Sequence, residues 1–146
     1  MVSGGQRKRT DRYKAQKYHR VARALLGGAS VLMELASEGD SYGNAIAVLA
    51  IHAAIAYNDA LTISYGELKS TDGQHTRAAD LLAEVMKGVN TREVSSRADQ
   101  LRAILGSKDR VSYTGTFYRI QDAALLHAQV LDFATWADAM YQRRPV

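Results

Sequence analysis

The chain of 146 residues contains no cysteine and only one proline, Pro145. The absence of cysteine excludes disulfide bonds and thiolate metal sites. Because the one proline lies at the C-terminal end, only glycines and polar clusters are available to end helices elsewhere. Long helices are therefore permitted along almost the whole sequence.

The common signatures of catalysis and nucleotide binding are also missing. The sequence has no P-loop, dinucleotide glycine pattern, nucleophile elbow or His-Glu-x-x-His helix. Its histidines fall on different expected elements, without the spacing that would gather them around a metal ion. We therefore expect no metal site and no cofactor, and the sequence leaves open whether the protein is an enzyme. The four histidines are His19, His52, His75 and His127.

No hydrophobic stretch predicts a membrane span. The purely apolar run Ala45–Tyr57 is rich in alanine and contains His52, whereas a spanning helix needs about 20 apolar residues. The basic N-terminus is not followed by the hydrophobic run that a signal peptide requires. We therefore expect a cytoplasmic protein without a membrane partner.

Positive charge is concentrated at the beginning of the chain. Residues 1–23 contain eight lysines and arginines and one acid, whereas the remaining residues contain 11 basic and 14 acidic side chains. Such a basic end favours an anionic partner. One hypothesis is therefore a nucleic-acid binder that works through its basic first helix alone. The alternative is a solvated first helix behind a loose basic start.

Apolar residues recur at helical spacing through most of the chain and predict five helices. The second of them is apolar on every side, which is typical of a helix wrapped by others. Asn90 with Glu93 three residues later predicts a capping box at the start of the fourth. The expected helices cover about residues 10–37, 42–65, 75–87, 90–106 and 121–142.

This pattern predicts an all-α fold, an up-and-down helical bundle of about five helices. Residues 10–142 are expected to form a single domain. Residues 1–9 are expected to be a basic, flexible N-terminus, and residues 143–146 a tail. No strand-like alternation of useful length is visible in the sequence.

Two polar sites interrupt the apolar second helix. His52 among alanines is typical of a core histidine that donates to a backbone carbonyl. Burying an ionised Asp59 would be costly unless the carboxylate meets a cation. Asp59, together with Asn58, is therefore either one half of a buried ion pair or part of a functional site. Three later residues are candidates for the cation: Lys108, Arg110 and Arg119.

The segment 108–119 combines basic residues and tyrosines around Thr114 and Gly115. Basic groups and tyrosines beside a glycine turn can bind a phosphate and stack on a base. The alternative is a loop whose tyrosines close one end of the bundle. The candidate ligand-binding residues on this segment and on the helix opposite are Asn58, Lys108, Tyr113 and Arg119.

Four segments in order, IAYNDALTI, HTRAADLL, KDRVSYTG and LDFATWAD, resemble a bacterial branch of the HEPN superfamily of small helical proteins. The resemblance spans most of residues 20–140. It implies a HEPN-like bundle, a homodimer and an RNA or nucleotide ligand. Many members are similar to metal-independent ribonucleases with an Arg-x4-6-His motif, and others are toxins paired with antitoxins of the nucleotidyltransferase type.

The motif is degenerate in this chain. Arg110 is not followed by a histidine at the required spacing, and His127 lies one residue too far after Arg119. In a degenerate site, Lys108 and Arg110 stand at the basic position and Tyr113 at the partner position. Because a tyrosine with a pKa of about 10 accepts a proton poorly at neutral pH, the resemblance leaves catalysis open.

The leading hypothesis is a HEPN-like homodimer that binds RNA or a nucleotide, as a component of a toxin–antitoxin or phage-defence system. If RNA is cleaved, Arg110 would stabilise charge on the phosphate, Asp59 would orient it and His127 would transfer a proton. The alternative is a non-catalytic structural or protein-interaction dimer with a buried Asp59–Arg110 pair.

Overall fold

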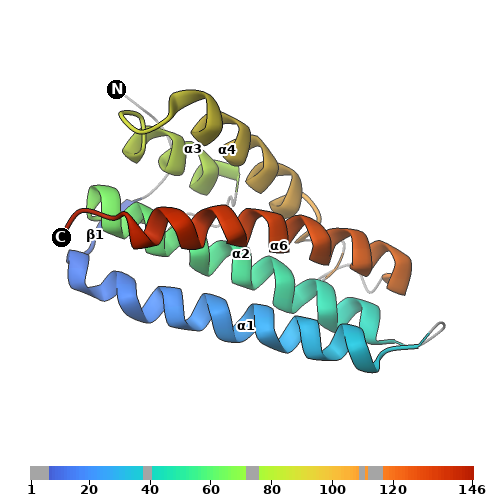
Figure 1. Cartoon of the computed structure of the whole chain (residues 1–146). Coiled ribbons are helices and arrows are strands. Elements are labelled where there is room, and N and C mark those ends of the chain that lie inside the picture. The colour runs from blue at the N-terminus through green and yellow to red at the C-terminus, as the bar shows by residue number, and fades with distance from the viewer. Residues whose placement is uncertain (1–6, 38–40, 72–75, 109–110, 112–116) are drawn as a thin grey trace.

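The chain folds into an all-α bundle, as predicted, in a computed structural model that describes residues 7–37, 41–71, 76–108, 111 and 117–146 (Figure 1). Five helices occupy the described ranges, and their bounds lie within a few residues of the expected ones. They are α1 Ala15–Leu35, α2 Tyr42–Gly66, α3 Thr76–Val85, α4 Thr91–Leu105 and α6 Ile120–Gln142. Three short elements accompany them: β1 Arg7–Arg9, the 3-10 turn η1 Arg12–Lys14 and β2 Leu68–Ser70.

Helix α2 is the centre of the bundle, with α1 and α6 along two of its sides and α3 against its second half (Figure 1). Of its 25 residues, 16 are buried. The helix is long and apolar enough to cross a membrane, but 78% of its most apolar window is buried inside the fold. It is therefore the core helix of this bundle.

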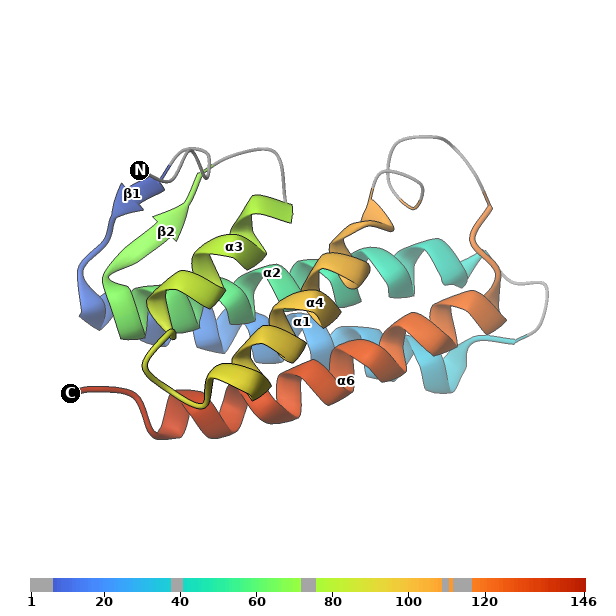
Figure 2. The ribbon, with the colours of Figure 1, turned by 90° about the horizontal axis from the view of Figure 1, so that it is seen from above.

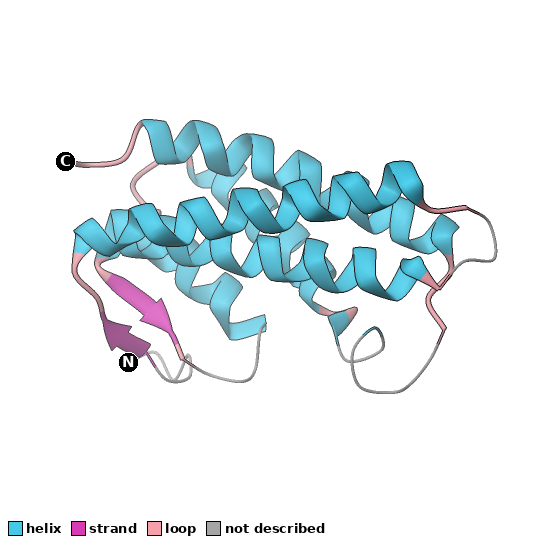
Figure 3. Ribbon diagram, turned by 90° about the horizontal axis from the view of Figure 1, so that it is seen from below, coloured by secondary structure: helices cyan, strands magenta, loops and turns pink. Residues whose placement is uncertain are grey.

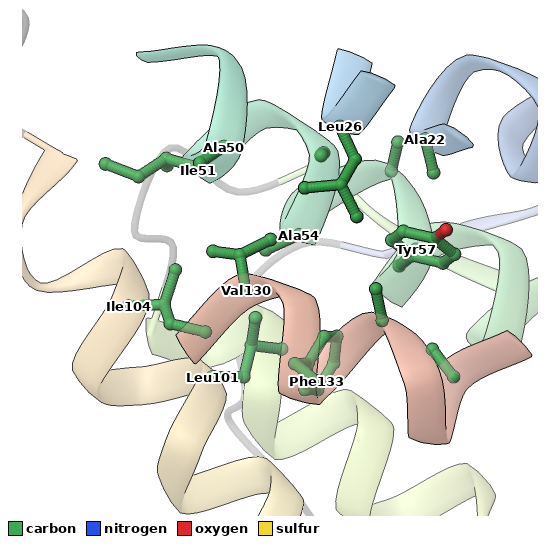
Figure 4. Packing of buried hydrophobic residues seen from close by; sticks show 14 of the residues in the cluster. Ala22, Leu26, Ala50, Ile51, Ala54, Tyr57, Leu101, Ile104, Val130 and Phe133 are labelled. Carbon is green, nitrogen blue, oxygen red and sulfur yellow. The ribbon is translucent and has the colours of Figure 1, made fainter. Parts of the chain in front are cut away.

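The core is made where α2 meets α6 and α4. Ile51 of α2, Val130 and Phe133 of α6 and Leu101 and Ile104 of α4 are each completely buried (Figure 4). Burying one such side chain stabilises a fold by about 1.5–3 kcal/mol. The contact between α2 and α1 uses smaller residues, chiefly alanines, so the two helices can approach closely.

Helices α2 and α6 run parallel. Near their starts, the backbone N–H of Tyr118 donates to Oδ1 of Asn44 over 2.8 Å. Near their ends, the hydroxyl of Tyr65 donates to the carbonyl of Met140 over 2.6 Å. A Cβ on Gly43 would collide with the carbonyl oxygen of Tyr118, so only glycine allows the backbone before α6 to approach the first turn of α2.

The two strands are the main difference from the sequence prediction. Residues 7–9 of the expected flexible terminus pair antiparallel with residues 68–70, which the sequence assigned to a loop. The pairing continues at Thr10, whose N–H donates to the carbonyl of Glu67 over 2.9 Å. Since Thr10 is held in this way, α1 begins at Ala15 rather than at residue 10.

Helix ends follow the local sequence closely. Asn90 caps α4 by accepting a hydrogen bond from the N–H of Glu93 over 3.2 Å, and Gly106 follows its last residue, as predicted. Helix α1 continues through Gly27 and Gly28. Helix α2 ends at Gly66 and is capped by Glu67, which adopts the left-handed conformation with φ of 53°.

Candidate functional site

Asp59 is buried, as predicted, but its cation comes from β2. The nearest ammonium belongs to Lys69, whose Nζ lies 3.9 Å from Oδ2 of Asp59. Only 7% of Asp59 is exposed. Burial raises the pKa of Asp59 to about 7, and the positive charge of Lys69 offsets only part of this effect. The carboxyl group is therefore half-protonated near neutral pH.

The cations expected for Asp59 lie elsewhere. Arg119 is the residue before α6, next to Tyr118, which bonds Asn44 at the start of α2. Asp59 lies 15 residues beyond Asn44, or about 22 Å along the helix. Lys108 is buried after α4, and its positive charge acts on His52, about 10 Å from Asp59 along α2. The predicted pairing of Asp59 with Lys108 or Arg119 is therefore wrong.

Two residues of the predicted site, Arg110 and Tyr113, lie outside the described residues. Asn58 is described and buried, and its Nδ2 donates to the carbonyl of Ala78 in α3 over 3.1 Å. Within the described ranges its Oδ1 has no hydrogen-bond partner. Asn58 thus binds α3 while Asp59 pairs with β2, so the two side chains face different neighbours.

His127 lies at the contact between α6 and α1. Its Nε2 is 2.9 Å from Oγ of Ser30, and burial lowers the pKa of the imidazole. It faces α1, whereas Asp59 faces β2. The structure therefore does not bring together the two described members of the catalytic set expected from the resemblance.

The expectation that His52 is a core histidine is also wrong, because this residue is exposed. Partial desolvation of the ring, followed by the positive charge of Lys108, lowers its pKa. The alanines on either side of His52 suggested burial. However, the bundle leaves this one stripe of α2 open to solvent.

A cluster that the sequence analysis missed joins three helices. Nε2 of His19 in α1 lies 2.8 Å from Oδ1 of Asp138 in α6. The hydroxyl of Tyr57 in α2 donates to the other carboxylate oxygen over 3.5 Å. Burial, and then the charge of Asp138, raises the pKa of Tyr57, so the phenol stays protonated. The ring of His19 stacks on Tyr141 with centroids 4.0 Å apart.

Sequence separation explains why this cluster was missed, since His19 and Asp138 are 119 residues apart. One signal was available. His19 shares a face of α1 with Ala15, Ala22 and Leu26, at helical spacing. A histidine on an apolar face needs a buried partner, and this argument could have predicted that His19 has one.

The end of the bundle next to this cluster contains a pocket of about 340 Å³. Arg12 and Tyr13 line it from the start of the chain, and Tyr141 and Arg144 line it from the end. Tyr13 is 75% exposed. The guanidinium of Arg144 lies 3.9 Å from the centre of the Tyr141 ring. Tyr141 itself is buried, with His19 stacked on its ring. The pocket therefore combines two guanidinium groups with one exposed aromatic ring, that of Tyr13.

This end is strongly basic because the fold gathers segments from far apart in the chain. Strand β1, the end of α2, strand β2 and the end of α6 lie at this end, beside the C-terminus (Figure 2). The strand register places Lys8 directly opposite Lys69, and like charges in that relation repel each other. Two acids offset part of the charge: Glu84 pairs with Arg7 at 2.7 Å, and Glu67 lies 3.6 Å from Arg9 and 3.7 Å from Arg12.

A second pocket, of about 440 Å³, lies between α4 and the start of α6. Its lining includes Asp122 and two exposed apolar residues, Phe117 and Leu125. The described lining contains no lysine or arginine. Of the two cavities, the one at the basic end has the chemistry of an anion site. The described ranges contain no group of three residues able to hold a metal ion.

No family model, curated protein or solved structure matches this chain.

Proposed function

We propose that the protein is a HEPN-like bundle that binds RNA or a nucleotide at its basic end. The observation that carries this proposal is the pocket between Arg12, Tyr13, Tyr141 and Arg144, built where the first and last segments of the chain meet. We therefore propose the end of α2 and α6 as the binding site, in place of the segment 108–119 that the sequence suggested.

The charge of this end favours a polyanion. Lys8, Arg9 and Arg143 are exposed around the pocket, and Lys8 faces Lys69 across the strands. Each phosphate that such a surface neutralises releases counterions, which supplies affinity at low salt. A phosphodiester would also relieve the repulsion between the two lysines.

The pocket itself suits one nucleotide. Its volume of about 340 Å³ lies within the range of about 300–1,000 Å³ that is typical of small-ligand sites. Arg12 and Arg144 each donate one N–H to a backbone carbonyl, those of Ser64 and Tyr141. Their remaining N–H groups can donate to a phosphate. Tyr13, which is exposed, can stack on the base, as tyrosines do in proteins that bind single strands. Such contacts tolerate any base, so sequence preference is expected to be weak.

The all-helical bundle agrees with the HEPN resemblance, and a toxin–antitoxin or phage-defence role is part of the proposal. An adjacent reading frame for a nucleotidyltransferase-like partner would support that role. Binding does not require catalysis. If RNA is cleaved, Asp59 is the first residue to test as a general acid or base. It lies near the basic end, and its carboxyl group has a pKa of about 7.

The test is fluorescence anisotropy with a labelled single-stranded RNA, using Tyr13→Ala and its matched control Tyr42→Ala. Both tyrosines are exposed, at 75% and 40%, but Tyr42 begins α2 at the opposite end of the bundle. Loss of one stacked base costs about 1–3 kcal/mol, so we expect Tyr13→Ala to weaken binding roughly tenfold. Tyr42→Ala should bind as the wild type does.

A second pair of variants separates the two candidate sites. The double variant Lys8→Ala/Arg143→Ala removes two charges from the basic end, and Arg119→Ala removes one from the predicted segment. For a single-stranded RNA, each lost phosphate contact reduces the slope of log K against log salt concentration by about 0.7. A reduced slope in the double variant alone supports the basic end. A reduced slope in Arg119→Ala alone would return the site to segment 108–119.

A further inference from the structure

Three lysines at the basic end lie around one tyrosine ring. Nζ of Lys69 in β2 lies 5.7 Å from the centre of the Tyr18 ring in α1, and Nζ of Lys17 lies 5.9 Å from it. Lys8 is directly opposite Lys69 in the strand pair, so both side chains emerge on the same face of the strands. The strands lie at the end of the bundle where α1 begins and α2 ends (Figure 3). The lysine cluster is Lys8, Lys17 and Lys69.

The lysine cluster differs from the neighbouring arginines in its partners. Each of the three arginines of β1 and η1 has a carboxylate within ion-pair distance. Within the part of the chain that the structure describes, neither Lys8 nor Lys17 has one. Their ammonium groups can therefore bind an anion without first breaking an ion pair. The arginine pairs are Arg7–Glu84, Arg9–Glu67 and Arg12–Glu67.

Lys69 has a carboxylate neighbour but is not saturated by it. Its Nζ lies 3.9 Å from Oδ2 of Asp59, which is too long for a hydrogen bond. An ammonium group has three N–H donors, and Lys69 uses one of them, in a bond of 3.4 Å to the carbonyl of Ser70. Since 24% of the Lys69 side chain is exposed, a phosphate oxygen can accept from the donors that remain.

The lysine cluster is separate from the pocket but close to it. Gln16 lines the pocket, whereas Tyr18 follows two residues later, which turns its side chain by about 200° around α1. The two sites therefore lie on opposite sides of the first turn of α1. A helix with its side chains is about 10–12 Å across. One nucleotide cannot fill both sites, but a strand of several nucleotides can pass from one to the other.

We propose that the lysine cluster is a second phosphate site for the RNA strand that occupies the pocket, and that Asp59 controls this site by holding Lys69. The inference rests on the proposed function and narrows its ligand to a single strand of several nucleotides. A phosphate bound between Lys8 and Lys69 draws the ammonium of Lys69 away from Asp59. Because lysine stems are flexible, Lys17 can reach the same phosphate or the next one.

This arrangement couples binding to a proton. The carboxyl group of Asp59, with a pKa of about 7, is half-protonated near neutral pH. A bound phosphate adds a negative charge nearby and removes the ammonium of Lys69, and both changes raise the pKa of Asp59 further. Binding therefore takes up protons, so affinity falls as pH rises through about 7. The other charged or titratable side chains described around the Asp59–Lys69 pair are Tyr18, Lys17, Lys8 and, two turns away on α2, His52.

The first test compares a strand with a mononucleotide. The probes are AMP and a labelled single-stranded RNA of about eight nucleotides, within the range of about 4–16 that single-strand sites cover. Lys17→Ala should reduce the slope of log K against log salt concentration by about 0.7 for the RNA. It should leave the affinity for AMP unchanged, because Lys17 does not line the pocket. Circular dichroism checks that this exposed substitution keeps the fold.

The second test is the Kd of the same RNA, without terminal phosphates, at pH 6 and pH 8. Uptake of one proton changes log K by at most about one per pH unit, so we expect the wild-type Kd to rise roughly fivefold. Asp59→Asn cannot ionise and should bind at both pH values as tightly as the wild type does at pH 6. Asp122→Asn is the matched control. It removes an exposed acid at the opposite end of the bundle and should keep the wild-type pH dependence.

A salt slope that Lys17→Ala leaves unchanged, or a pH dependence that Asp59→Asn retains, would overturn the inference. If Tyr13→Ala still weakens RNA binding in that case, the proposed function stands without the second phosphate site. A wild type that binds no RNA even at low salt would overturn the proposed function itself. The two failures are therefore distinguishable.

Discussion

Asp59 shows what burial does to a carboxyl group with one distant cation. At 3.9 Å, Lys69 is at the outer limit of an ion pair, and the carboxyl group is shielded from water on its other sides. The folded protein therefore favours the protonated acid, with a pKa of about 7 against the ordinary value of 3.8. The unfolded chain, in which the group is solvated, favours the carboxylate.

The first prediction concerns the pH dependence of stability. Because the folded pKa of Asp59 is above the unfolded pKa, its contribution to stability is fully present below about pH 4 and is lost as pH rises through about 7. A pKa raised from 3.8 to about 7 corresponds to roughly 4 kcal/mol. Asp59→Asn should therefore resemble the wild type at pH 4 and be more stable by roughly this amount at pH 8. Urea unfolding at the two pH values measures the difference.

Asp122→Asn is the matched control for that experiment, because Asp122 is an exposed acid in the first turn of α6. It should not gain stability as pH rises. If Asp59→Asn follows the same pH profile as the wild type, the carboxyl group is ionised throughout and is paired better than the distance to Lys69 implies.

The second prediction compares two histidines. His19 is buried, stacked on Tyr141 and bonded to Asp138, whereas His52 is exposed on α2. His19→Ala should lower the free energy of unfolding by roughly 2–4 kcal/mol, since it removes the buried, stacked ring and its hydrogen bond to the partly exposed Asp138. His52→Ala should change it by less than about 0.5 kcal/mol. Chemical denaturation at pH 7 measures both, and equal effects would contradict the assignment of roles.

At the scale of elements, helices were predictable and strands were not. Helical periodicity and the Asn90 cap are local, so the sequence carries them. Strands β1 and β2 are three residues each, too short for an alternating pattern, and their pairing depends on where α2 ends. The partners of Asp59 and His19 were unpredictable for the same reason. They depend on which helices lie side by side, and this information is not local.

The third prediction tests the parallel packing of α2 and α6. Gly43→Ala places a methyl group against the carbonyl of Tyr118, and the backbone before α6 must move to avoid it. Overpacking of this kind costs about 1–3 kcal/mol or more. Gly88→Ala is the control, since a Cβ there meets nothing within 4 Å. Thermal melts should show a lower midpoint for Gly43→Ala alone. An equal midpoint would mean that this approach of the two elements is not required.

At the scale of the whole molecule, the fold gathers the excess positive charge of the chain at one end of the bundle. The sequence places its excess cations before residue 24, and the parallel course of α2 and α6 brings Arg143 and Arg144 to the same end (Figure 2).

The fourth prediction follows from that charge distribution. Binding of a labelled single-stranded RNA should weaken as the salt concentration rises, because counterions released from the phosphates supply part of the affinity. Anisotropy titrations at several salt concentrations measure the slope of log K against log salt concentration. A slope near zero would mean that the basic end does not contact phosphates.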